Sequence, residues 1–153
     1  MANYRQMLYV VGKVIESQVN RLNNHAHSKT ETYPTLASGK PVQGSTIAWE
    51  YGNFAEIIPA GAIDKPFDIH YIKIESSPGT GVYEIHFFSG KLGEEVDIGS
   101  IRIVQPPGAF STAMSVPFQR PIMPKGTRIS AKMASTVTNT PTVVMSVQYH
   151  TYG

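Results

Sequence analysis

The chain has 153 residues, enough for one domain with a buried core but few for two. Charged residues make up only 16% of it, against about 25% in ordinary soluble domains, and the formal net charge is +2. The small charge and the lack of a basic run argue against nucleic-acid binding, and the absence of cysteine excludes disulfides and thiolate metal sites. A surface poor in solvated groups predicts contact with copies of the chain or with another protein.

The opening residues, MANYRQ, lack the basic and apolar regions of a signal peptide, and no segment is apolar for long enough to cross a bilayer. We therefore expect no membrane partner. A fold that needs no cysteine suits assembly in a reducing cytosol.

Residues 4–25 carry the one clear helical pattern, with stripe positions alternately four and three apart. Gly12 and several valines lower helix propensity, so this helix needs packing against another surface. The sequence leaves open whether it lies on its own domain, forms an oligomer seam or serves as a docking arm. The stripe consists of Tyr4, Leu8, Val11, Ile15, Gln18, Leu22 and His25.

Residues 25–45 are polar and punctuated by Pro and Gly, which predicts a linker or extended arm. His25 and His27 form a short His-x-His that could bind a metal only with a third ligand, so we interpret them as solvated loop residues. The predicted organisation is an N-terminal helix and arm over 1–45 and a β-domain over 46–153.

Beyond Ser45 short apolar runs with period two alternate with turn residues, a pattern typical of an all-β antiparallel sandwich or barrel. About eight strands are expected, the usual size of a jelly roll. A change of parity between Val96 and Ile103 predicts a β-bulge at Gly99. The expected strands are 46–51, 54–58, 67–75, 82–88, 95–104, 114–119, 127–134 and 142–150.

The stretch FDIHYIKIESSPGTGVYEIHFF, residues 67–88, reads as one β-hairpin that sets His70 beside His86 and Asp68 near Glu84. Such a group could hold a divalent cation or supply a general base. Because apolar residues share that face and also fill the opposite one, we interpret the histidines as half-buried sheet residues covered by another element or subunit.

We assign no catalytic, cofactor-binding or metal-binding residues, since the serines lack a G-x-S-x-G setting and no glycine-rich phosphate loop is present. We expect the chain to bind no cofactor. The residues expected at an interface are Leu8, Val11, Ile15, Leu22, His70, Ile72, Ile74, Glu84, His86 and Phe88.

Trp49, Tyr51 and Phe54 form an aromatic cluster. Aromatic side chains beside a strand usually belong to a core or an interface, and the alternative is a platform for sugars.

Five phrases between residues 57 and 152 carry a family resemblance: IIPAGAIDKPFDIHYIKIESS, VYEIHFFSG, EEVDIGSIRIVQ, RPIMPKGTRISAKMAS and TVVMSVQYHTYG. The run resembles the small jelly-roll virion proteins of tailed bacteriophages, among them capsid decoration (cement) proteins and related head or fibre modules. The resemblance implies a non-enzymatic homo-oligomer, commonly a trimer, that bridges major capsid protein subunits on the shell. It also implies a virion location, with assembly in the bacterial host cytoplasm.

Two other hypotheses remain at this point. The first is a fibre, baseplate or tail-associated jelly roll that binds host glycans through Trp49, Tyr51 and Phe54, or through the C-terminal Tyr149, His150 and Tyr152. The second is a metal-dependent cupin-like enzyme, which would need His70, His86 and Glu84 to converge in a barrel mouth.

Overall fold

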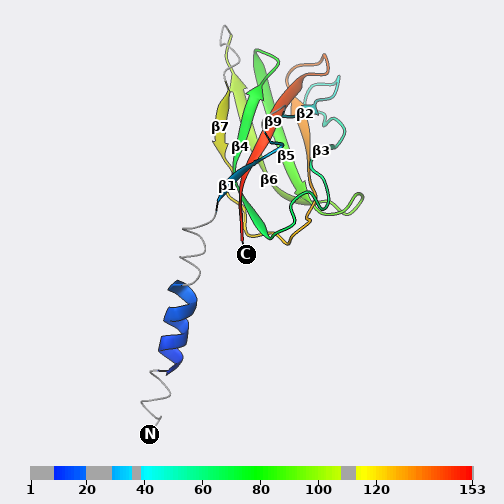
Figure 1. Ribbon diagram of the computed structural model, residues 1–153. Helices are drawn as coiled ribbons and strands as arrows, with labels where there is room; N and C mark the ends of the chain where they lie inside the picture. The colour runs from blue at the N-terminus through cyan, green and yellow to red at the C-terminus, as the bar shows by residue number, and fades with distance from the viewer. Residues whose placement is uncertain (1–8, 20–28, 36–38, 108–112, 153) are drawn as a thin grey trace.

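The computed structural model describes residues 9–19, 29–35, 39–107 and 113–152, which form one helix and nine strands (Figure 1). The helix covers residues 9–19. The strands are β1 (Thr30–Tyr33), β2 (Lys40–Gln43), β3 (Ala55–Ile58), β4 (Phe67–Ser76), β5 (Gly81–Ser89), β6 (Val96–Gln105), β7 (Met114–Pro117), β8 (Ile129–Ser135) and β9 (Thr142–Thr151).

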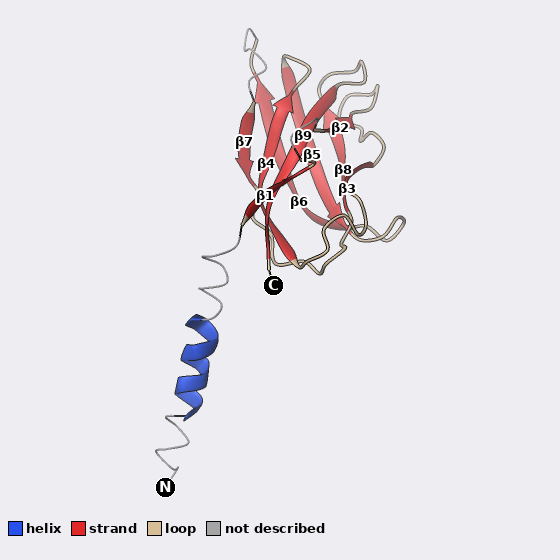
Figure 2. Cartoon of the chain, in the orientation of Figure 1, coloured by secondary structure: helices blue, strands red, loops and turns tan. Residues whose placement is uncertain are grey.

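Two antiparallel sheets stack as a sandwich, the layers drawn in red in Figure 2. The first sheet has the order β1-β9-β4-β7, and β2 also pairs with β9; the second has the order β3-β8-β5-β6. Strands adjacent in the chain thus belong mostly to different sheets. The predicted jelly-roll β-sandwich is confirmed.

The core lies between the two sheets and is complete within one chain. Both sheets contribute to it, because alternate residues of every long strand point inward. The largest fully buried side chains are Tyr83, Phe67, Phe87, Ile57, Ile58, Ile69, Ile72, Ile74, Ile85, Ile129, Met133 and Met145.

Residues 25–45, predicted as a linker or extended arm, contain β1 and β2, which both pair with β9 and so belong to the first sheet. Both strands are four residues long, and β1 has no fully buried residue. Main-chain pairing to β9, which hydrophobic alternation does not reveal, places them in the first sheet.

The prediction of a strand at 46–51 was wrong. These residues form turns, and Trp49 has a φ of +62°, which lies outside the β region.

The predicted β4–β5 hairpin was wrong, because the two strands lie in different sheets. β4 pairs with β7 and β9, whereas β5 pairs with β6 and β8. His70 and His86 are therefore not neighbours.

A bulge in β4 explains why both of its faces look apolar. Ile69 pairs with Tyr149 and Tyr71 with Gln148, so His70 is an extra residue that reverses the parity of the strand. Ile72 and Ile74, expected at an interface, consequently lie in the core with exposures of 0% and 1%.

The predicted bulge at Gly99 is confirmed. Phe87 pairs with Gly99 and Phe88 with Asp97, which leaves Ile98 as the extra residue of β6. Gly99 has a φ of +123°, a value that side chains disfavour.

Helix 9–19 exposes every one of its residues and stands clear of the sandwich in Figure 1. The rest of the predicted helix 4–25, including Leu8, Leu22 and His25, lies outside the described residues, as does His27. In the part of the chain that the structure describes, no helix combines the length and hydropathy needed to cross a bilayer.

Candidate functional site

Residues 45–54 lie on the outer face of the second sheet and form one wall of a pocket. The Trp49 N–H donates to the Ser135 carbonyl at 2.8 Å, and the Gly52 N–H donates to the Met133 carbonyl at 2.9 Å. Both acceptors belong to β8, so the segment extends the line of β3 beside that strand. The chain itself thus covers part of the outer face of the second sheet and leaves the rest, including Arg102 of β6, exposed.

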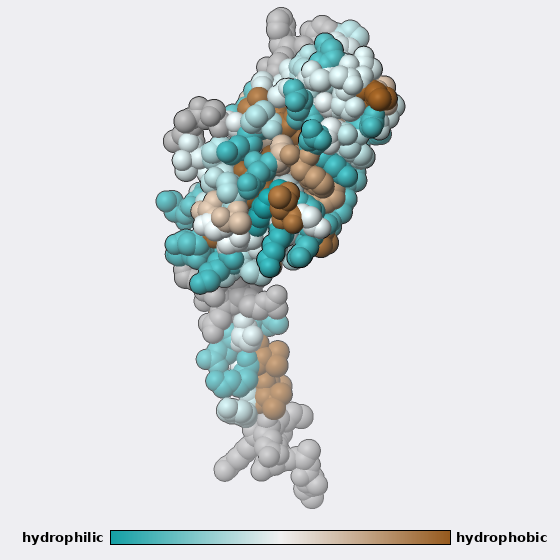
Figure 3. Space-filling model, turned by 90° about the vertical axis from the view of Figure 1, so that its right-hand side faces the viewer, coloured by the Kyte–Doolittle hydropathy of each residue, from teal (hydrophilic) through white to brown (hydrophobic). Residues whose placement is uncertain are grey.

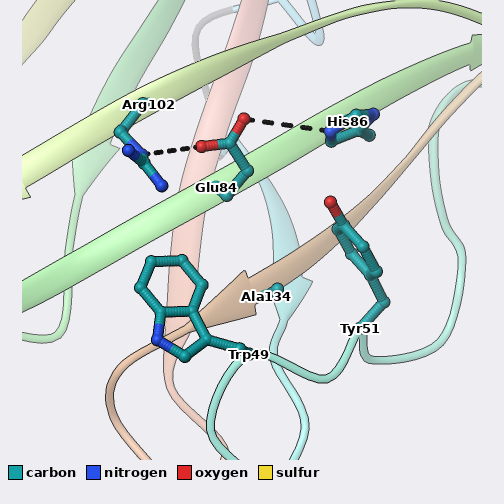
Figure 4. A pocket seen from close by; sticks show the side chains of 6 residues that line it. All are labelled: Trp49, Tyr51, Glu84, His86, Arg102 and Ala134. Atoms are coloured by element: carbon teal, nitrogen blue, oxygen red, sulfur yellow. Dashed lines mark hydrogen bonds and ion pairs between the residues drawn. The ribbon is translucent and has the colours of Figure 1, made fainter.

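The pocket has a volume of about 520 Å³ and opens to solvent. Volumes of about 300–1,000 Å³ are usual for small-molecule sites. Figure 4 shows two aromatic rings facing a row of polar side chains across Ala134. The lining residues are Trp49, Tyr51, Glu84, His86, Arg102 and Ala134.

Cross-strand pairing builds the polar row. Glu84 and Arg102 are partners in the β5–β6 register, and the Arg102 Nε donates to the Glu84 Oε2 at 2.8 Å. His86 Nε2 lies 3.8 Å from the other Glu84 oxygen, while its Nδ1 donates to Asp97 Oδ2 at 2.8 Å. This hydrogen bond from His86 is the largest cause of the lowered pKa of Asp97.

The aromatic side is held by ring and cation contacts. The Arg102 guanidinium lies 5.5 Å from the Trp49 ring, and Tyr51 meets His86 edge-on at 5.4 Å. Trp49 is 49% exposed and Tyr51 38% exposed, so both rings can take a ligand. Burial, followed by the charges of Glu84 and Asp97, raises the pKa of Tyr51, whose hydroxyl stays protonated at neutral pH.

Phe54 is separated from the pocket by a lysine. Lys132 Nζ lies 4.9 Å from the Tyr51 ring, 5.2 Å from the Phe54 ring and 5.0 Å from the Phe88 ring. Phe54 also packs edge-on against Phe88 at 5.0 Å. These contacts fix the aromatic segment on the sheet and leave Trp49 and Tyr51 as the rings that face the pocket.

This arrangement suits binding more than proton transfer, because Arg102 already neutralises the Glu84 carboxylate. Exposed rings can stack on the apolar face of a ligand. Paired charges beside them can hydrogen-bond its hydroxyl groups.

The cluster required by the cupin-like hypothesis does not form. Glu84 and His86 line the pocket on the second sheet, whereas His70 lies in the first sheet beside Asp68 and His150. The hypothesis was wrong because it depended on the β4–β5 hairpin.

The C-terminal aromatic platform does not form either. Tyr149 is 6% exposed, and its hydroxyl donates to Glu31 Oε2 at 3.0 Å. Tyr152 donates to Asp68 Oδ2 at 2.6 Å. These hydrogen bonds tie the two tyrosines to neighbouring strands of the first sheet, Tyr149 to β1 through Glu31 and Tyr152 to β4 through Asp68.

Sequence reasoning did not assign Arg102, Asp97 or Lys132 to a site. The sequence pattern that could have indicated Arg102 is the alternation along β6, where Arg102 stands between the buried Ile101 and Ile103. That pattern places a residue on the outer face but does not reveal which loop covers it.

We expect the Asp97→Asn variant to lose slightly less thermal stability than the parent chain as the pH falls. The folded pKa of Asp97 is lowered, so its contribution is present above the unfolded pKa of about 3.9 and disappears as pH falls through the folded value. Because the side chain is 48% exposed, the effect should be about 2 °C in Tm. Thermal unfolding from pH 6 to pH 2 measures it, and equal slopes for variant and parent would contradict it.

We expect Gly52→Ala to displace the aromatic wall. A Cβ at this position would collide with the Gln43 backbone oxygen on β2, which we expect to cost about 2 kcal/mol of unfolding free energy. Trp49 is the single tryptophan, so its fluorescence reports the pocket during urea unfolding. Gly12→Ala is the control, since nothing surrounds Gly12 within 4 Å; equal midpoints for the two variants would contradict the prediction.

No family model and no curated protein sequence matches the chain. Similar solved structures come from infectious bursal disease virus, all at 10% identity over 83% of this chain: its Gt strain (TM-score 0.41), its VP2 subviral particle (0.41) and its Gx strain (0.42). The chain covers 34%, 33% and 32% of those chains, about one third of their length. Likeness at this level carries no information on activity or partners.

Proposed function

We propose that the chain is a non-enzymatic structural protein of a virus particle, of the tailed-phage kind that residues 57–152 resemble. In this proposal it is a decoration (cement) protein that binds the major capsid protein on the head and stabilises the shell. A protein that binds the assembled lattice but not its separate parts stabilises the lattice by mass action.

The exposed apolar side of helix 9–19 is the observation that carries the proposal. At 3.6 residues per turn its apolar residues fall on one half of the helix surface, and Figure 3 shows them gathered along one side. The sandwich has a complete core of its own and leaves this side uncovered. The side consists of Val10, Val11, Val14, Ile15 and Val19, which are 46–59% exposed.

Other copies of the same helix are the partner that this side fits. The spacing of four and three, with Val11, Ile15 and Gln18 in the described part, is that of helices that pack on one another. The Lys13–Glu16 ion pair lies on the opposite side, at 2.9 Å. We infer a homo-oligomer, a trimer by the family resemblance, in which the helices join the copies and the sandwiches contact the shell.

Cosedimentation with phage heads tests the capsid partner. The full chain should pellet with assembled heads at saturating stoichiometry and should raise the temperature at which they dissociate. A chain that stays in the supernatant with every head preparation tried would contradict the decoration role.

The pocket supports a second candidate, a virion module that binds host glycans. Trp49 and Tyr51 present exposed rings beside the Glu84–Arg102 pair, the combination of stacking and hydrogen bonding that a sugar requires. This function is compatible with a helix-joined oligomer, since several weak pockets on one stalk bind a glycan-covered surface by avidity.

A further inference from the structure

Asp68, His70 and His150 bring three ligand atoms together on the outer side of the first sheet. All of these atoms lie within 4.8 Å of one another. Asp68 and His150 are partners in the β4–β9 register, and His70 is the bulged residue of β4. Bulges often re-aim a side chain next to a functional site, and here the bulge keeps His70 beside Asp68.

The distances suit a small tetrahedral metal ion. His70 Nε2 lies 3.1 Å from Asp68 Oδ1, and His150 Nδ1 lies 3.8 Å from the same oxygen. Zinc with nitrogen and oxygen ligands at about 2.0–2.2 Å requires ligand atoms about 3.3 Å apart. The imidazole centroids are 4.0 Å apart, so small side-chain rotations would bring the three donors onto one ion.

Two neighbouring hydroxyls orient the ligands. Thr30 Oγ1 lies 2.8 Å from His150 Nε2, a contact that leaves Nδ1 as the ligand atom. The Tyr152 hydroxyl donates to Asp68 Oδ2 at 2.6 Å, while Asp68 Oδ1 is buried and accepts no hydrogen bond in the described part of the chain. Outer contacts of this kind fix the tautomer and direction of metal ligands.

The buried Asp68 carboxylate has hydrogen-bond partners on one oxygen only: the Tyr152 hydroxyl and His70 Nε2 contact Oδ2 at 2.6 and 3.1 Å, while Oδ1 makes no hydrogen bond in the described part of the chain. Asp68 is 7% exposed as a residue, and the side chains of His70 and His150 are 15% and 16% exposed. A buried ionised carboxylate needs a paired charge or a metal. The slight exposure of the two imidazoles leaves a path for an ion and for a water molecule as fourth ligand.

We propose that Asp68, His70 and His150 bind one divalent transition-metal ion of the zinc class. The ion would join β4 to β9, and through Thr30 it would also fix β1, the strand that follows the N-terminal segment. Its role is to hold β1, β9 and β4 together at this place in the first sheet.

Zinc titration of the untagged full chain, stripped with EDTA, tests this inference. We expect one Zn²⁺ per chain by calorimetry and a rise in Tm of about 5 °C at a hundredfold excess over Kd. Asp68→Asn and His150→Gln keep the size of the side chains and their contacts with Tyr152 and Thr30. Each should weaken binding by more than the 10- to 100-fold that loss of an outer contact costs.

His25→Ala/His27→Ala is the matched control, because it removes the other closely spaced histidine pair. This variant should bind Zn²⁺ as the parent does. Circular dichroism checks that each variant folds, and the visible spectrum of the Co²⁺ form reports tetrahedral coordination independently of stability. A parent chain that binds no Zn²⁺ and no Co²⁺, or equal binding by the parent, Asp68→Asn and His150→Gln, would overturn the inference.

Discussion

Val11→Gln/Ile15→Gln is expected to convert the oligomer into monomers and to abolish cosedimentation with heads. Both side chains lie on the exposed apolar side of helix 9–19, where we propose that other copies bury them. Each buried aliphatic side chain contributes about 2 kcal/mol, so the pair should weaken association roughly 1,000-fold. Light scattering across a concentration series measures the change.

Tyr9→Gln/Lys13→Gln is the matched control. It has the same spacing of four residues but changes the opposite side of the helix, where Lys13 pairs with Glu16. This variant should keep the parent's mass. If both double variants behave alike, the apolar side does not join the copies.

Trp49→Ala is expected to abolish detectable glycan binding at the concentrations used in an array. Removing the Trp49 ring takes away the more exposed of the two stacking surfaces and leaves Tyr51 and the Glu84–Arg102 pair to hold the sugar. A loss of about 2 kcal/mol, roughly 30-fold in Kd, follows from the apolar area of one aromatic side chain. A glycan array with the labelled full chain identifies the ligand, and calorimetry then gives the ratio of affinities.

Ile47→Ala is the control for this experiment. Ile47 is 61% exposed and belongs to the same covering segment, but it does not line the pocket. Its variant should bind as the parent does. A parent chain that binds no glycan, or a Trp49→Ala variant that retains full affinity, would leave the pocket without this function.

Most of the fold could be predicted because strand alternation is a local property. Ile129, Ala131 and Met133 alternate along β8, and all three are fully buried. The bulge at Gly99 was readable for the same reason, since a parity change appears within a few residues of sequence. β1 and β2 were missed because their place depends on pairing with β9, whose partner residues lie 99 to 120 positions further along the chain.

The sites were less predictable because they depend on pairings between distant strands. The aromatic cluster at Trp49 and Tyr51 was visible in the sequence, but its polar partner Arg102 comes from β6. His70 was assigned to the wrong neighbour, because a tight turn after β4 suggested a hairpin while the chain crosses to the other sheet. His150, its actual neighbour, lies 80 residues further along the chain.

The apolar pattern on both faces of 67–88 also had local causes that composition does not distinguish from an interface. In β4 the bulge at His70 turns Ile72 and Ile74 into the core. In β5 the chain's own Phe54 packs on Phe88. The case for assembly therefore rests on the N-terminal helix and no longer on these strands.

The mass of the untagged full chain in solution, measured by light scattering at micromolar concentration, tests the central claim most directly. The exposed side of helix 9–19 predicts an oligomer, and the trimer proposed here would have three times the 16.8 kDa mass of one chain. A chain that remains monomeric up to millimolar concentration would contradict the claim that this helix joins copies into a virion subunit.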